Sequence, residues 1–401
     1  MEPGQSAPSP RRRPSSRREA IAANAGELFT SRGFHAVRMD HIAEASGITA
    51  RALYRHYDSK QHLLAHVVLE DQRRVMDAIA TLDTSEPGEP LEQRLTVLTQ
   101  AAMAGRSLSL LWQREARHLA PDDYRQVRRQ TTWMARRFRE LLVETERDDL
   151  DEQVSDVRSW VVISIVSGHS LYDSSLSRAQ LVHELAAAAA RVIRAPVVAA
   201  PGEAVHATAD RTSVSRREQL LHAATRAFRE RGYGGVSLDE IGGEVGIVGP
   251  ALYRYFGAKA DLLVAAVNRW QEWLALELTR ALRAPVADGD VFAHVVDGHI
   301  RLTLEATDPL AVALTERLWL PEAVRDDVDR VQADYLDEWQ RWLGAASADL
   351  SRNQAATLVR VAKTIVDDLV RIPHLRSYPG LAGELAHAVH SAVDTATPQV
   401  S

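Results

Sequence analysis

The chain of 401 residues contains no cysteine. Disulfide bonds, thiolate catalysis and cysteine-based zinc sites are therefore excluded, and a reducing compartment is the natural setting. The sequence also lacks an uninterrupted apolar stretch long enough to cross a bilayer. Residues 1–18 carry arginine and proline without the apolar core of a secretory signal. We therefore expect a cytoplasmic protein that makes no contact with a membrane.

Motifs of catalysis and metal binding are scarce as well. Residues 168–170, Gly-His-Ser, lack the second glycine of a hydrolase nucleophile turn and lie within a helical pattern rather than after a strand. His62, His66 and Glu70 are spaced four apart, but the zinc-protease helix motif requires a glutamate directly after its first histidine. We expect no enzyme, no metal site and no cofactor.

Charge is unevenly distributed along the chain. The formal net charge of −6, taken globally, argues against a nucleic-acid partner. The first residues nevertheless hold a cluster of arginines, namely Arg11, Arg12, Arg13, Arg17 and Arg18. Phosphate attraction is screened beyond about 8 Å at physiological salt, so a basic end on an acidic body can still bind DNA. We expect residues 1–15 to be a disordered basic tail that either follows a DNA backbone or merely solvates the chain.

An internal repeat organises the sequence. Ser16-Arg17-Arg18-Glu19 recurs as Ser215-Arg216-Arg217-Glu218, and Ala52-Leu53-Tyr54-Arg55 recurs at the same spacing as Ala251-Leu252-Tyr253-Arg254. Because polar and apolar positions keep one register, a whole module has been duplicated. The expected order is the tail, a head (16–64), a body (65–194), a linker (195–213), a second head (214–263) and a second body (264–396).

The pattern of apolar residues is typical of helices throughout. Apolar positions lie three and four apart, and alternating β-like segments are absent. We expect an all-α fold of two tandem modules, each with a three-helix head followed by a helical body. In the first head the helices should cover 16–32, 39–45 and 49–57. Gly33 should end the first helix, Gly47 should form the turn, and Thr49 should cap the third helix.

The third helix of this head presents a polar outer face. Arg51, Tyr54 and Arg55 are three and four residues apart, so they share one side of a short helix. Such a helix fits the major groove in the manner of a helix-turn-helix recognition helix. Lys60, at the start of the next helix, would lie beside the backbone phosphates.

This arrangement resembles the tetracycline-repressor (TetR) family. The resemblance rests on Phe29-x-x-x-Gly33-Phe34, Asp40-x-Ile42-Ala43-x-x-x-Gly47-Ile48 and Leu53-Tyr54-Arg55-His56-Tyr57-x-x-Lys60, and the second repeat carries the corresponding pattern. It implies phosphate contacts from Tyr54, His56, Lys60, Tyr253, Tyr255 and Lys259. It implies positions at or near base edges for Thr49, Arg51, Arg55, Val248, Pro250 and Arg254.

The two heads depart differently from the family pattern. Ser237, with Glu240 three residues later, predicts a capping box at the second helix of the second head. The first head has Arg38 there, which cannot cap but could reach a phosphate. In the second head Gly249-Pro250 removes polar side chains from the tip of the recognition helix, although proline suits a first helical turn and a helix should form. The two heads should therefore prefer different DNA sequences.

The resemblance also implies bodies that bind a small molecule and dimerise through their last two helices. The matching pairs are 153–172 with 179–193 and 353–372 with 380–393, and the alanines at 186–190 would allow close packing. The candidate ligand-binding residues are Trp112, Trp133, Phe138, Trp160 and His169 in the first body, and Phe292, His299, Trp319, Tyr335 and Trp339 in the second. For each of them, packing in the core is the alternative interpretation.

These features together predict a ligand-responsive transcription regulator. We expect a repressor that a hydrophobic or amphipathic effector releases from double-stranded operator DNA. The alternative is an interaction protein in which one or both heads no longer bind DNA and the bodies serve assembly. The bodies either pair internally as a pseudo-dimer or pair with a second chain. In a pseudo-dimer the half-sites should differ, because Arg51 aligns with Pro250.

Replacing Arg51 tests the base-edge assignment. We predict that Arg51→Ala costs about 1–3 kcal/mol of binding free energy on the cognate duplex and relaxes base preference at one position. Fluorescence anisotropy with cognate and random duplexes of equal length measures both effects. An equal loss on the two duplexes would contradict the assignment.

Overall fold

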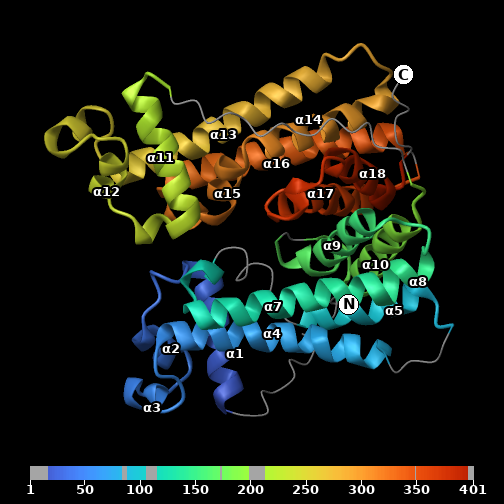
Figure 1. Ribbon diagram of the computed structural model, residues 1–401, viewed down its shortest axis with the longest axis horizontal. Coiled ribbons are helices and arrows are strands. Elements are labelled where there is room, and N and C mark those ends of the chain that lie inside the picture. Colours follow the sequence, from blue (N-terminus) through green and yellow to red (C-terminus); the bar gives the residue numbers. More distant parts are fainter. Residues whose placement is uncertain are drawn as a thin grey trace, which may run out of the picture.

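The computed structural model describes residues 17–83, 88–104, 115–171, 174–197, 213–347 and 349–395 (Figure 1). Over these ranges the chain is helical and contains no strand, as the sequence predicts. None of the helices there is long and apolar enough to span a membrane. Residues 1–15, Trp112 and most of the expected linker lie outside the described ranges, so the expectations for them stay predictions.

Two modules follow one another along the chain. The first contains α1 (Arg17–Arg32), α2 (Met39–Ala45), α3 (Ala50–Tyr54), α4 (Lys60–Asp83), α5 (Leu91–Ala104), η1 (Ala116–His118), α7 (Pro121–Phe138), η2 (Arg139–Val143), α8 (Glu144–Glu146), α9 (Glu152–Ser167), η3 (Gly168–Leu171) and α10 (Arg178–Arg194). The second contains α11 (Arg216–Arg231), η4 (Tyr233–Gly235), α12 (Leu238–Glu244), η5 (Gly249–Arg254), α13 (Lys259–Leu282), η6 (Asp288–Asp290), α14 (Val291–Glu305), α15 (Thr307–Thr315), η7 (Arg317–Trp319), α16 (Glu322–Ala346), α17 (Arg352–Leu369), η8 (Leu375–Ser377) and α18 (Leu381–Val393).

Each head is fused to its body by a long helix. In the first module α4 runs without interruption across the expected boundary after residue 64, and in the second α13 does the same across residue 263. The apolar core of the first head extends into the body, where it includes Ala116, Leu119 and Val127. The position of each head therefore depends on the packing of its own body.

The two bodies pack against each other within the chain. Helices α9 and α10 of the first module lie against α17 and α18 of the second (Figure 1), and their apolar residues belong to one continuous core. We call this four-helix contact the seam. Ala188 and Ala189 of α10 are fully buried, which agrees with the predicted close packing of the alanine run. The helix pairs expected to form a dimer interface thus meet inside a single chain.

Polar contacts fix the register of the seam. The Arg191 guanidinium of α10 donates to the backbone carbonyls of Ser391 and Ala392 at 3.2 and 2.5 Å. These carbonyls lie in the last turn of α18, where the Ser391 carbonyl also accepts from the Asp394 N at 3.3 Å. Gln354 of α17 donates to Glu184 of α10 at 2.6 Å. Burial lowers the pKa of Arg191, and the nearby carboxylates of Asp394 and Glu184 oppose this shift.

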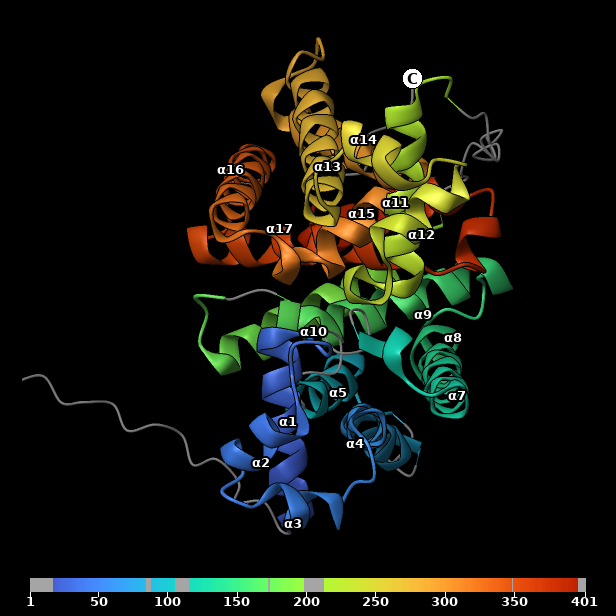
Figure 2. The ribbon, with the colours of Figure 1, turned by 90° about the vertical axis from the view of Figure 1, so that its left-hand side faces the viewer.

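Both heads lie at the same end of the molecule. In Figure 1 the elements α1–α3 and α11–α12 occupy the left-hand side, and Figure 2 shows this side facing the viewer. Because the seam joins the bodies, it also sets the separation and orientation of the two heads.

Removing Arg191 tests the contribution of the seam. Arg191→Ala should lower the free energy of unfolding by about 1–3 kcal/mol, because the Ala392 carbonyl loses its donor and the Ser391 carbonyl loses one of two. Arg194→Ala is the matched control, since Arg194 is half exposed and pairs within the first module with Glu92. The control should cost less than about 1 kcal/mol. Urea denaturation followed by circular dichroism measures both, and equal losses would show that the seam contacts add nothing.

Candidate nucleic-acid interface

The recognition helix of the first head begins as the sequence predicts and ends earlier. The Thr49 Oγ1 accepts from the Ala52 backbone N at 3.2 Å and caps α3. The helix covers Ala50–Tyr54 rather than reaching residue 57. The chain turns there because Tyr57 enters the core, fully buried, and its hydroxyl donates to the Arg18 carbonyl at 3.2 Å. Gly33 and Gly47 adopt the left-handed φ values of +77° and +62° that their predicted positions require.

The outer face of this head carries arginines without acidic partners. Arg51 and Arg55 are exposed, and the Tyr54 side chain between them is 51% exposed. Arg38 is exposed as well and makes no side-chain capping bond. Among the described residues, none of these guanidinium groups lies within ion-pair distance of a carboxylate. Their charge is therefore available to phosphates and base edges, whereas His56 is half-buried.

Lys60 and its counterpart Lys259 have protein partners in the structure. The Lys60 Nζ donates to the carbonyls of Phe34 and Val37 at 2.7 and 2.8 Å. Lys259 repeats this arrangement with Tyr233 and Val236 at 2.7 and 2.6 Å. Burial lowers the pKa of both lysines. Each ammonium group thus holds the loop before the second helix of its head, and the expected phosphate contact stays a prediction.

The second head confirms the capping box and corrects the expected recognition helix. Ser237 Oγ accepts from the Glu240 N at 3.2 Å, and Glu240 accepts from the Ser237 N at 2.6 Å. Gly249–Arg254 forms a 3₁₀ helix and not the expected α-helix. Gly249, its first residue, has φ +59°, which lies outside the right-handed helical region, and Pro250 after it has no N–H to donate.

The exposed tip of this second recognition element is largely apolar. Val248 is 72% exposed, and Pro250 is exposed beside it. Tyr253, Arg254 and Tyr255 are exposed on the following turn. The two heads therefore present the same scaffold with different surfaces, one cationic and one mixed apolar and aromatic.

A buried carboxylate anchors each head to its body, and sequence reasoning missed both. Glu115 accepts from the Phe34 N at 3.2 Å, and Glu316 accepts from the Tyr233 N at 3.0 Å. Both side chains are almost completely buried. A third residue, Arg117 of the first body, forms an ion pair with Glu316 of the second. Glu115 and Glu316 occupy matching places in the repeat, and this could have been found by extending the alignment into the bodies.

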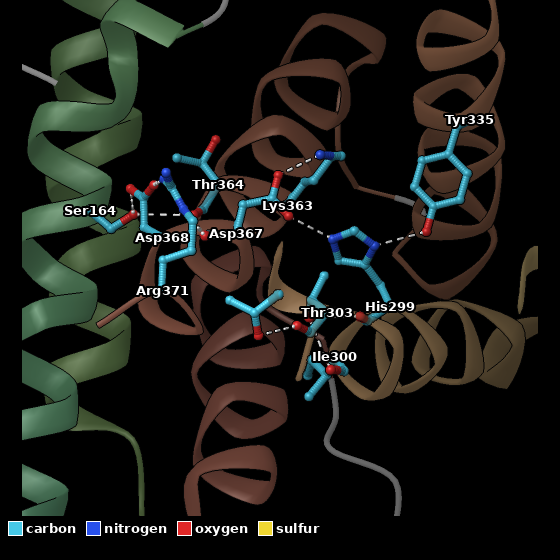
Figure 3. Close-up of polar contacts among 11 residues, drawn as sticks. Ser164, His299, Ile300, Thr303, Tyr335, Lys363, Thr364, Asp367, Asp368 and Arg371 are labelled. Carbon is cyan, nitrogen blue, oxygen red and sulfur yellow. Dashed lines mark hydrogen bonds and ion pairs between the residues drawn. The ribbon is translucent and has the colours of Figure 1, made fainter. Parts of the chain in front are cut away.

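The candidate ligand-binding residues of the second body are mostly in its core. Phe292, Tyr335 and Trp339 are buried, and the ring of Trp319 lies 5.3 Å from that of Tyr233. His299 is fully buried between Asp367 and Tyr335, with its Nε2 2.9 Å from Asp367 Oδ1 and its Nδ1 3.1 Å from the Tyr335 hydroxyl (Figure 3). Burial lowers the pKa of His299.

The candidates of the first body are more scattered. Phe138 is buried in the core, Trp133 is 38% exposed, and His169 is half-buried at the end of α9. A cavity of about 400 Å³ lies between the two bodies. Among the ligand candidates that the structure describes, Trp160 lines it. We call this space the seam cavity. Its walls come from η1, α7 and α9 of the first module and from α11, α15, α17 and the segment after α17 of the second.

The comparisons with known proteins agree with this architecture. A family model described as bacterial regulatory proteins, tetR family, matches residues 21–67 and residues 220–266. An uncharacterised helix-turn-helix transcriptional regulator of Mycobacterium tuberculosis is 31% identical over 170 residues, covering 35% of this chain and 83% of that protein. The regulator CymR of Pseudomonas putida is 27% identical over 147 residues, which cover 35% of this chain and 70% of CymR. A solved TetR-family regulator from Bordetella parapertussis is 18% identical, with a TM-score of 0.41, and covers 47% of this chain and 100% of that chain.

Two helix-turn-helix heads carried on helical bodies define a DNA-binding transcription regulator. The family model matches both heads, and the chain covers most of the length of a relative that is 31% identical. The chain therefore belongs to the tetR family of bacterial regulatory proteins, and it carries the DNA-binding head of that family twice.

Two substitutions in the first head separate stability from DNA contact. Lys60→Met should lower the free energy of unfolding by about 1–3 kcal/mol, because two loop carbonyls lose their donor. Arg38→Ala removes an exposed cation that has no side-chain partner within the described part of the chain, so it should leave the melting temperature unchanged and weaken binding to every duplex alike. Calorimetry and salt-dependent anisotropy measure the two effects. A Lys60→Met protein of unchanged stability would contradict a stabilising role for the hydrogen bonds from Lys60 to the Phe34 and Val37 carbonyls.

Proposed function

We propose that this regulator is a repressor that binds one operator with both heads of a single chain and leaves it when a small molecule binds the bodies. The observation that carries the proposal is the presence of two unlike heads at the same end of one fused pair of bodies. The chain thus supplies internally the paired bodies that two identical chains supply in a homodimer. A single chain is then sufficient for a two-part operator.

The surfaces of the heads support an operator with unlike halves. The first head offers Thr49, Arg51 and Arg55, whose side chains can hydrogen-bond to base edges or phosphates. The second offers Val248 and Pro250, which make only apolar contacts such as that with a thymine methyl group. Arg254 corresponds to Arg55 and is placed at or near the base edges, and the two exposed tyrosines of the second head remain for phosphate contact. The proposed operator is therefore an imperfect palindrome with half-sites about one helical turn apart.

Release by an effector follows from linkage between two sites. A small molecule that binds better when the heads are misplaced weakens DNA binding by the same factor. The bodies supply the means of transmission, since α4 and α13 are shared between head and body and Glu115 and Glu316 tie each head to its body. A small shift in body packing is therefore converted into a movement of the heads.

Transplanting the tip of one head onto the other tests the proposed operator. The triple variant Val248→Thr, Gly249→Ala and Pro250→Arg gives the second head the Thr-Ala-Arg tip of the first. Selection from a random duplex library should return unlike half-sites for the natural chain and more nearly identical half-sites for the variant. An unchanged second half-site would show that this head does not read bases.

The stoichiometry of the DNA complex is the second readout. Light scattering of the natural chain on its selected duplex should give one chain per two half-sites. Two chains per duplex, with a footprint well beyond two half-sites, would rule out the pseudo-dimer. Binding that lacks both salt dependence and sequence preference would instead favour an assembly protein.

A further inference from the structure

The seam cavity is notable for its arginines. Four of them line it, namely Arg117, Arg229, Arg371 and Arg376, among apolar side chains that include Trp160, Ile163, Leu369 and Ile372. A concave, mostly apolar space with a few convergent polar groups is the usual form of a small-molecule site, and the volume of about 400 Å³ lies within the usual range for such sites. The predominance of guanidinium groups favours a ligand with a negative charge.

The charges around the cavity leave one arginine in excess. Arg229 pairs with Asp308 at 2.8 Å, Arg371 with Asp368 at 2.9 Å, and Arg117 with Glu316. Figure 3 shows the Asp368 and Arg371 pair beside Ser164 of α9, whose hydroxyl donates to Asp368 at 2.8 Å across the seam. Arg376 is exposed at the cavity and has no carboxylate partner among the described residues. Its guanidinium group can therefore receive an anion without the loss of an existing ion pair.

We propose that the seam cavity binds one amphipathic anion per chain, with an apolar body against Trp160 and Ile163 and a carboxylate, sulfonate or phosphate group at Arg376. This names the class of effector and the place where it acts, and for its effect on DNA it rests on the proposed function. The site is formed by both modules together, so neither body contains it alone.

The charged side chains that line the cavity contact the second head, whereas the first head's core contributes the apolar Ala116 to its wall. Arg229 belongs to α11, the first helix of the second head, and Arg117 donates to the Phe228 carbonyl in the last turn of α11 at 3.4 Å. In the repeat, Arg229 corresponds to Thr30 of the first head, and Arg117 corresponds to Leu318 of the second body. Neither Thr30 nor Leu318 carries a charge. The structure supports the match of Arg117 with Leu318. Arg117 lies beside Gly232 of the second head, and Leu318 lies beside Gly33, the equivalent glycine of the first head.

A negative charge held at Arg376 also attracts Arg229 of α11 and Arg117 in the same cavity, and so weakens their ion pairs with Asp308 and Glu316. Glu316 also holds the Tyr233 N at the start of the loop after α11. Redistribution of these contacts changes the position of α11, and with it the second recognition element, while the Glu115 contact with the first head is unaffected. Occupancy therefore regulates the half-site that the second head binds.

Two naphthalene dyes that differ only in charge test the site. The probe 1-anilinonaphthalene-8-sulfonate (ANS) belongs to the proposed class, and N-phenyl-1-naphthylamine (NPN) is the same molecule without the sulfonate. ANS should bind at one site per chain, about tenfold or more tighter than NPN. Arg376→Ala should reduce ANS affinity to the level of NPN without a change in melting temperature. The matched control is Arg330→Ala, which removes an exposed arginine of α16 outside the cavity. It should change neither the ANS affinity nor the melting temperature.

Two further measurements locate the site and define its chemistry. Ile163→Trp fills the cavity and should abolish ANS binding, while retained binding would place the dye elsewhere and overturn the proposal. Decanoate and decyl phosphate should displace ANS, and their relative strengths distinguish a carboxylate from a phosphate ligand. Decyltrimethylammonium has the same alkyl chain and should not displace it. Displacement by this cation, or equal binding of ANS and NPN, would overturn the proposal.

The effect of the anion on DNA binding is measured as affinity for duplexes in which one of the two half-sites is scrambled. Saturating ANS should change affinity for the second half-site by a factor on the order of 5 to 150 and leave the first within about twofold. Arg229→Gln, at saturating ANS, should remove this response. Equal responses of the two half-sites would overturn the coupling to α11. A chain that binds ANS as expected but binds no DNA would instead contradict the proposed function and leave the anion site standing.

Discussion

The apolar contact of α9 and α10 with α17 and α18 is the constraint on which the rest of the structure depends. It joins two modules into one core, and it contains the small side chains and helix-end carbonyls that allow close approach. Each head is an extension of its body through a continuous helix. The seam therefore sets where the two heads lie relative to each other.

Duplication within one chain has a consequence that a homodimer cannot have. In a symmetric dimer every contact occurs twice, so the two heads and the two halves of the interface are identical. Here the repeats have diverged while the scaffold is retained. Phe34 and Tyr233, Lys60 and Lys259, and Glu115 and Glu316 still match in place and contacts. The pairs Arg51 and Pro250, and Arg117 and Leu318, occupy equivalent places but differ in chemistry and contacts. The positions that match hold the fold, whereas Arg51 and Pro250 lie on the exposed faces of the heads and Arg117 lines the seam cavity.

The heads were largely predictable because their structure is local. A helix that ends at Gly33, a turn at Gly47 and a cap at Thr49 depend on residues within a few positions of each other. The same reasoning gave the correct capping box at Ser237. It failed at Gly249–Arg254 because a proline at the first turn was weighed without the positive φ of the glycine before it. It also could not anticipate that Lys60 faces inward, since its carbonyl partners are more than twenty residues away.

The sequence by itself determined the helical fold, the duplication and the two helix-turn-helix motifs. These follow from periodicity and from motifs contiguous in the chain. Only the tertiary structure decided that the bodies pair with each other, that Phe292, Tyr335 and Trp339 fill a core while Trp160 faces a cavity, and that arginines from both modules surround it. An aromatic residue on an apolar helix face has the same local pattern in a core and in a pocket. The difference arises from helices more than a hundred residues apart, whose packing no local pattern encodes.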